Sequence, residues 1–133
     1  MAERLYINPK ALPDPPGNFS WVTRSGNTLY LAGQVGIDAS GKTIGIGDAE
    51  AQVMQAYRNI EATLKELGGS LNNLVKVVTF VVGKENMAAA RKGRKAVGDS
   101  GMMTIKPAST LVVVAALADD SWLVEVDAIA ILD

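Results

Sequence analysis

Apolar residues recur with the spacing of an amphipathic helix in one segment, residues 53–67. They follow one another at intervals of four, three, four and three, which places them on a single helical face. Asp48 precedes this stripe as a good N-cap, and Gly68 and Gly69 follow it as a stop signal. The pattern predicts a helix that covers a core with Val53, Tyr57, Ile60, Leu64 and Leu67.

Three later apolar runs are typical of strands. Leu74–Val82 is apolar on both faces, as a central buried strand is. Pro107–Ala115 and Trp122–Ile131 are similar runs, and Ala118–Ser121 between them has turn chemistry. These last two runs are therefore predicted to pair as a C-terminal hairpin.

Shorter strand-like runs fill the N-terminal third of the chain. Between them lie a proline-rich loop over residues 8–17, the tight turn Ser25–Asn27, and glycines at 33 and 36 that interrupt the last run. The predicted strands are Leu5–Ile7, Phe19–Arg24 and Thr28–Ala32.

A second, weaker helix is predicted over Asn86–Val97. Gly93 inside it costs about 1 kcal/mol relative to alanine. This helix carries a basic cluster, and the usual explanation of such a cluster is a solvated face. The alternative is an anion-binding lip beside a site. The cluster consists of Arg91, Lys92, Arg94 and Lys95.

The order of these elements indicates a single α+β domain over residues 1–133, with a sheet of about six strands and two helices on one face. The later strands are apolar on both faces, but two helices can cover only one face. We therefore expect a homo-oligomer in which the uncovered sheet faces are buried.

Composition excludes several classes of function. The chain has no histidine and no cysteine, which removes histidine-dependent triads, disulfides and most zinc or iron sites. A net charge of −1 does not favour nucleic acid or an anionic membrane as a partner. The first residues do not resemble a signal peptide, and no apolar run reaches the roughly 20 residues of a spanning helix. We expect a cytoplasmic protein with no metal and no cofactor.

Candidate chemistry centres on the last predicted strand. Glu125 and Asp127 alternate onto the same face among large apolar residues, where a carboxylate must be paired or have its pKa raised. An interface salt bridge is one explanation of Glu125, and positioning a water or a proton is the other. Ser109 is a candidate hydroxyl donor or an ordinary strand residue, and Gly33-Gln34 offers donors at a bulge.

Taken together, these segments resemble the RidA/YjgF family, the reactive intermediate deaminases also described as L-PSP endoribonucleases or translation inhibitors. The similarity runs from about Leu12 to the end of the chain. The motifs that carry it are Pro16-Gly-Asn-Phe-Ser20, Gly26 to Gln34 with its Leu-Ala-Gly-Gln ending, Gln52, Asn59-Ile60, Leu64 and Gly68, Val75-Lys-Val77, Pro107-Ala108, Val112-Val-Val-Ala115, and Leu123-Val-Glu-Val-Asp-Ala-Ile-Ala130.

The resemblance implies a chorismate-mutase-like fold and a homotrimer with a barrel-like centre and clefts between subunits. Active members of the family hydrolyse imines and enamines such as 2-aminoacrylate to keto acids and ammonia, without metal or cofactor. A glutamate on the last strand orders the attacking water, and Glu125 matches it. An arginine just after the Pro-Ala motif grips the substrate carboxylate, but that position here is Ser109.

Three further positions depart from the family pattern and make the cleft more apolar. Phe19 stands where the family has a tyrosine, Ala32 where it has a serine, and Leu111 where a cysteine is common. Together with Gly33 and Gln34, these positions are expected to bind a small, partly apolar ligand. Loss of the carboxylate clamp argues against the usual 2-aminoacrylate deaminase activity.

Several functions remain open at this point. The leading hypothesis is a trimeric protein that binds a small metabolite and possesses water-handling chemistry at Glu125. A second is the usual deaminase activity, retained because Arg91 or Arg94 replaces the missing arginine. A third is a binding module without turnover. A ribonuclease or translation inhibitor is the fourth, and the electrostatic footprint for RNA is poor.

Overall fold

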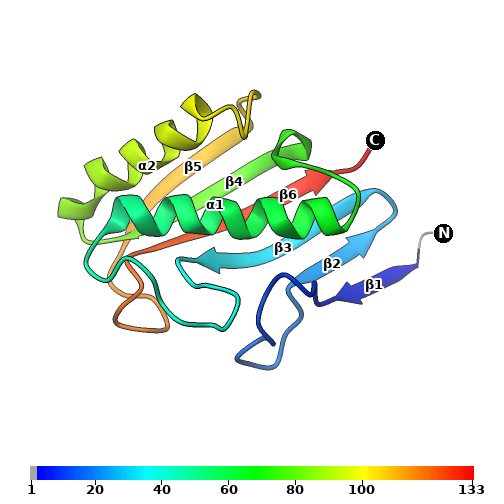
Figure 1. Cartoon of the computed structure of the whole chain (residues 1–133), viewed down its shortest axis with the longest axis horizontal. Coiled ribbons are helices and arrows are strands. Elements are labelled where there is room, and N and C mark those ends of the chain that lie inside the picture. The colour runs from blue at the N-terminus through cyan, green and yellow to red at the C-terminus, as the bar shows by residue number, and fades with distance from the viewer. Residues whose placement is uncertain (1–2) are drawn as a thin grey trace.

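The computed structural model describes residues 3–133 as one mixed six-stranded sheet with two helices. The predicted domain over residues 1–133 therefore includes Met1 and Ala2, which lie outside the described residues. Strand order across the sheet is β1-β2-β3-β6-β4-β5 (Figure 1). The strands are β1 Arg4–Ile7, β2 Val22–Ser25, β3 Thr28–Val35, β4 Leu74–Val82, β5 Ala108–Val114 and β6 Val124–Ile131.

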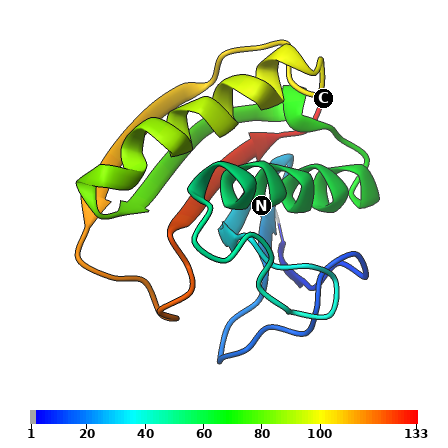
Figure 2. The ribbon, with the colours of Figure 1, turned by 60° about the vertical axis from the view of Figure 1, so that its left-hand side comes forward.

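Both helices lie on the same face of the sheet. Helix α1 (Ala49–Glu66) crosses the middle strands and α2 (Met87–Asp99) covers β4 and β5, as Figures 1 and 2 show. Val53, Tyr57, Ile60 and Leu64 of the predicted stripe are buried, whereas Leu67, at the C-cap, is only partly buried. The residues that face this stripe from β6 are small or β-branched. The core thus lies between the helices and one face of the sheet, with Val124, Val126, Ala128 and Ala130 as the contribution of β6.

The ends of α1 follow the predicted capping chemistry. The Asp48 carboxylate accepts a hydrogen bond of 3.0 Å from the backbone N–H of Ala51. At the other end, the backbone N–H of Gly69 donates to the carbonyl of Leu64 at 2.7 Å, while Gly68 takes a positive φ of 91°. The sequence prediction for this helix is confirmed to within one residue at each end.

Gly93 in α2 has a packing role that its low helix propensity does not predict. A Cβ atom at this position would lie 2.6 Å from the Glu50 carbonyl oxygen of α1 and 3.0 Å from Val53 Cγ1. The two helices therefore approach each other more closely than any larger residue would allow. The cost predicted for Gly93 in the isolated helix is offset by this contact.

The predicted C-terminal hairpin is wrong. β5 pairs in parallel with β4, and β6 pairs antiparallel with both β3 and β4, so β4 separates the two strands. A parallel pair needs a crossover connection, and α2 supplies it between β4 and β5. Residues 115–123 then carry the chain past the end of β4 to the centre of the sheet. This connection is longer than the two to five residues that are common in hairpins.

β3 continues through the predicted interruption. The strand runs to Val35, and the glycine segment forms a bulge at which the pairing with β6 shifts between Leu31 and Gln34. The one extra residue turns the end of β3 and brings Gly33 against β6. This bulge positions the candidate site.

The sheet face opposite the helices carries exposed apolar side chains. Tyr30, Val112 and Ile131 alternate along their strands with residues that face the core, and they are 51%, 37% and 46% exposed. No helix formed by residues 3–133 is both long and apolar enough to cross a membrane. The apolar open face is the feature from which the sequence predicted an oligomer.

Candidate functional site

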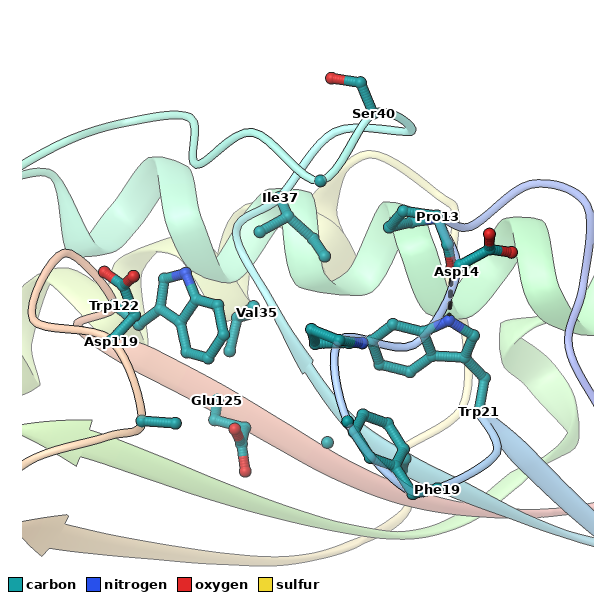
Figure 3. Close-up of a pocket in the computed structure, with 16 residues that line it drawn as sticks. Pro13, Asp14, Phe19, Trp21, Val35, Ile37, Ser40, Asp119, Trp122 and Glu125 are labelled. Atoms are coloured by element: carbon teal, nitrogen blue, oxygen red, sulfur yellow. Dashed lines mark hydrogen bonds between the residues drawn. The ribbon is translucent and has the colours of Figure 1, made fainter.

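A cleft of about 850 Å³ lies where three loops meet the ends of β3 and β6. Three aromatic side chains, Phe19, Trp21 and Trp122, form much of its wall (Figure 3). Phe19 and Trp21 meet edge to face, with ring centroids 5.3 Å apart. Because these rings come from loops on both sides of the hollow, the cleft has a large apolar surface.

Both indole N–H groups are already used by the protein. Trp21 Nε1 donates to the Pro13 carbonyl at 2.7 Å, and Trp122 Nε1 donates to Thr43 Oγ1 at 3.1 Å. The rings are therefore fixed in orientation and present mainly their carbon surfaces. A ligand with an apolar body fits such walls.

Two buried amides of α1 hold the cleft loops in place. The Gln52 amide donates to the carbonyls of Gly45 and Ser121 at 3.1 and 2.9 Å, and its oxygen accepts from the backbone N–H of Leu123 at 2.8 Å. Asn59 Nδ2 donates to the carbonyls of Val35 and Ile37, and both of those residues line the cleft. The two distances are 3.2 and 2.9 Å. The wall is thus attached to the rigid core.

Glu125 enters the cleft from β6. A Cβ atom at Gly33 would lie only 2.5 Å from Glu125 Oε2, so the carboxylate rests on the bare backbone of the β3 bulge. Its oxygens form no hydrogen bond or ion pair with residues 3–133. The carboxylate is consequently available to a ligand or a water molecule.

The environment of β6 raises the pKa of two carboxyl groups. Burial, and then the charge of Asp127, raises the pKa of Glu125 above its usual value. Burial also raises the pKa of Asp127. Both side chains share the open face, as predicted, but only Glu125 lines the cleft. Glu125 thus combines access to the cleft with increased basicity.

A second pocket of about 240 Å³ lies on the helix side of the sheet, under α2. Ser109 and Leu111 of β5 form its floor with Thr79 of β4, and Arg91 and Arg94 of α2 stand at its side. Its remaining lining residues are Val53, Tyr57 and Ala90. The pocket contains two guanidinium groups and no carboxylate.

The cleft and the second pocket lie on opposite faces of the sheet. Ser109 is paired with Val77, which is fully buried under the helices, whereas Glu125 alternates with the buried residues of β6 and faces away from them. Their charges also differ in sign. The cleft lining has three acidic residues and no Lys or Arg, and these acids are Asp14, Asp119 and Glu125.

The structure thus divides the predicted site residues into two groups. Phe19, Ala32 and Gly33 line the cleft with Glu125, while Arg91, Ser109 and Leu111 line the second pocket. Gln34 belongs to neither lining.

The Gln34 side chain is buried at 1% exposure, and its Nε2 donates to the Ala32 carbonyl at 3.4 Å. Its amide therefore stabilises the bulge from the core side of the sheet.

Sequence reasoning missed Trp21, Trp122 and Tyr57 as lining residues. Tyr57 was recognised only as part of the apolar stripe of α1, and nothing in the spacing of the two tryptophans places them around one hollow. Trp21 adjoins the predicted Phe19 loop, and this proximity was the one usable signal.

No group of three or more His, Cys, Asp or Glu side chains within residues 3–133 is arranged to hold a metal ion. Asp119 is one of the cleft acids, and its carboxylate accepts from the Ser121 hydroxyl at 2.6 Å. This bond lowers the pKa of Asp119. The Asp119 carboxylate therefore stabilises the turn that precedes β6.

The sheet carries both helices on one face and a carboxylate in an aromatic cleft on the other. This combination of fold and site defines a class of small α+β proteins. The sequence profile of the endoribonuclease L-PSP family matches residues 9–132, and the chain belongs to this family, which includes the RidA/YjgF proteins. The predicted family and its fold are confirmed.

Relatives cover almost the whole chain. A RutC family protein of Pyrococcus abyssi is 35% identical over 131 residues, which are 98% of both chains. A mouse protein named 2-iminobutanoate/2-iminopropanoate deaminase is 29% identical over 128 residues, 96% of this chain and 91% of its own. The crystal structure of a conserved Rid family protein from Yersinia pestis superimposes with a TM-score of 0.85 at 29% identity, and covers 98% of this chain and all of the other.

Proposed function

We propose that this protein hydrolyses a small imine or enamine with an apolar body, and that Glu125 positions and activates the attacking water. The observation that carries the proposal is the unpaired Glu125 carboxylate in the aromatic cleft. Burial and the charge of Asp127 raise its pKa, which makes it a better proton acceptor than an ordinary glutamate. Family membership, with relatives named as imine deaminases, supports this class of reaction.

The proposed reaction needs only water. Glu125 accepts a proton as the water oxygen adds to the C=N carbon, and the tetrahedral product then expels its nitrogen as ammonia. The nitrogen receives both protons of the water: Glu125 first passes on the proton it accepted, and then transfers the proton of the new hydroxyl group as the C–N bond breaks and the carbonyl forms. The aromatic walls hold the apolar part of the substrate and exclude bulk water.

We further propose that the working site lies between subunits of a homotrimer. Glu125 and Ser109 occupy opposite faces of one subunit, so only a neighbouring copy could bring the second pocket to the cleft. The acidic cleft and the basic pocket are complementary in charge. Contact between two different surfaces is head to tail and forms a ring such as a trimer when its rotation closes. The exposed apolar residues of the open face would be buried inside that ring.

A second candidate is the usual 2-iminopropanoate deaminase activity, with a helix arginine as the substitute cation. One observation favours it: Arg91 and Arg94 line the same pocket as Ser109, the position of the family arginine. Sequence reasoning had no way to place these two side chains beside that position. In this case the carboxylate grip would come from α2 instead of β5.

The test is a coupled assay in which 2-iminopropanoate is generated in situ and its disappearance is followed with and without protein. Glu125→Gln is compared with Asp127→Asn, which makes the same charge change on the same strand outside the cleft. Acceleration lost only in Glu125→Gln supports water activation by Glu125. Equal rates in Glu125→Gln and the unchanged protein would refute that role.

The same assay separates the two candidates. Acceleration that requires Arg91 or Arg94 supports the substitute cation. If 2-iminopropanoate is not accelerated while an imine without a carboxylate is, the apolar-substrate proposal stands. Ligand binding without acceleration of either substrate would identify a binding module, and size-exclusion chromatography with light scattering tests the trimer.

A further inference from the structure

The indole group of Trp122 begins a hydrogen-bond chain that joins two of the cleft loops. Trp122 Nε1 donates to Thr43 Oγ1 at 3.1 Å, and Thr43 Oγ1 lies 3.1 Å from Ser121 Oγ. The Ser121 hydroxyl has one hydrogen and donates it to the Asp119 carboxylate at 2.6 Å. The Thr43 hydroxyl therefore donates to Ser121, and its oxygen accepts from the indole. Every bond in this chain has a fixed direction, from Trp122 to Asp119.

Thr43 acts on the cleft only through this chain. Its side chain is not part of the cleft lining, whereas Trp122 and Asp119 both are. The Gln52 amide holds the backbones of the two loops, which fixes where the Trp122 backbone lies but not how its ring is turned. Trp122 is only partly buried, so packing does not enclose the ring. The hydrogen bond to Thr43 is thus the directional constraint on the orientation of the indole.

We propose that Thr43 is a positioning residue that sets the ligand selectivity of the cleft through the orientation of Trp122. The Trp122 ring and Glu125 face the same hollow (Figure 3), so the ring limits the space beside the carboxylate. A ring held in one orientation offers a fixed surface to a branched apolar group, and a small group contacts less of it. A ring that turns freely presents this surface only part of the time, which lowers the apparent affinity by that fraction. This inference rests on the proposed function for its catalytic consequence, because the same wall would hold the apolar part of the substrate.

The first test needs no ligand. The sequence has two tryptophans, so isotopically labelled protein gives two indole N–H resonances, and Trp122→Phe assigns them. Trp21 donates to the Pro13 carbonyl and is the internal reference. Thr43→Val keeps the side-chain shape and removes the hydroxyl, so the Trp122 indole proton should shift and exchange with solvent about tenfold faster. Thr43→Ser should restore both values. An unchanged Trp122 resonance in Thr43→Val would refute the proposal.

Two further variants test the chain itself. Thr63→Val makes the same replacement at a buried hydroxyl of α1 that has no hydrogen-bond partner among residues 3–133, and it should leave both indole resonances in place. Ser121→Ala removes the acceptor of the Thr43 hydroxyl but keeps the Thr43 oxygen, so the Trp122 resonance should shift by less than in Thr43→Val. A Trp122 shift of the same size in Thr63→Val would indicate an effect that the chain does not carry, and would overturn the assignment. No shift in Ser121→Ala would overturn the chain beyond Thr43.

The second test measures selectivity with two ketones of different size, each followed through the indole resonances. The probes are 4-methylpentan-2-one, which is the carbonyl product of a branched imine, and the smaller propanone. The unchanged protein should bind 4-methylpentan-2-one more tightly. Thr43→Val should lower the affinity for 4-methylpentan-2-one by about three- to tenfold and that for propanone by less than about twofold, whereas Thr43→Ser should keep the original preference. Equal losses for both ketones, or no saturable binding of 4-methylpentan-2-one to the unchanged protein, would overturn the role in selectivity.

The positioning role and the proposed function can fail separately. Neither test uses turnover, so a Thr43→Val variant that shifts the Trp122 resonance and loses ketone selectivity supports the positioning role even when no imine is hydrolysed. Imine hydrolysis by the unchanged protein, together with unchanged ketone selectivity in Thr43→Val, would leave the proposed function in place and refute the positioning role.

Discussion

Replacement of glycine by alanine is expected to have opposite effects on stability at the two glycines of α2. A Cβ at Gly98 would meet nothing within 4 Å, whereas a Cβ at Gly93 would lie 2.6 Å from the Glu50 carbonyl oxygen. The Glu50 oxygen belongs to the backbone of α1 and cannot rotate away. Gly98→Ala is therefore expected to stabilise the protein, and Gly93→Ala to force the two helices apart.

The magnitudes follow from two competing effects. Alanine gains up to about 1 kcal/mol over glycine in a helix at either position. Overpacking at a close backbone contact costs about 1–3 kcal/mol, and only Gly93→Ala incurs this cost. The two variants should therefore differ by about 1–3 kcal/mol. At about 4 °C per kcal/mol for a chain of this size, Gly98→Ala should unfold roughly 4–12 °C above Gly93→Ala.

The assay is thermal and urea unfolding of both variants and the unchanged protein, at one protein concentration because an oligomer unfolds in a concentration-dependent way. Unfolding of Gly93→Ala at or above the midpoint of Gly98→Ala would refute the close helix contact as the reason for the glycine.

Three further outcomes are expected. Asp127→Asn should raise the unfolding midpoint at pH 7: the folded pKa of Asp127 lies above its ordinary value of 3.8, so stability falls as pH rises through that range. In a pH series, the difference in unfolding midpoint between Asp127→Asn and the unchanged protein should vanish below about pH 4. Equal midpoints at pH 7 would contradict the raised pKa of Asp127. Gly33→Ala should displace the Glu125 carboxylate and lower turnover about 100-fold with little change in the midpoint, and full turnover would contradict this geometry. Gln52→Met removes three hydrogen bonds and should lower the free energy of unfolding, measured in urea, by about 2–4 kcal/mol. A decrease below about 1 kcal/mol would contradict the role of Gln52 in holding the cleft loops.

Local patterns in the sequence predicted the elements well because each depends on near neighbours. The stripe and caps of α1, the strand Leu74–Val82 and the alternation of Glu125 with buried residues are all short-range signals. The pairing of strands is not short-range. β5 and β6 are adjacent in the chain, and only the long connection between them indicated that another strand could lie between.

The candidate site could be predicted only where it lies on regular elements. Glu125 was found because strand alternation makes a carboxylate among apolar residues conspicuous. Trp122 and Trp21 were not, because loops tied by Gln52 and Asn59 determine their positions, and such long-range hydrogen bonds leave no periodic signal. Tyr57 was missed for another reason: its ring fits the apolar stripe of α1, and nothing in that stripe indicates that it lines the second pocket.

The central place of β6 has a consequence for biosynthesis. β6 follows every other described element in the chain, yet it joins β1-β2-β3 on one side to β4 and β5 on the other. Until β6 leaves the ribosome, β3 and β4 therefore have no partner along their facing edges. The nascent chain is thus expected to expose two unpaired strand edges until translation of this domain is nearly complete.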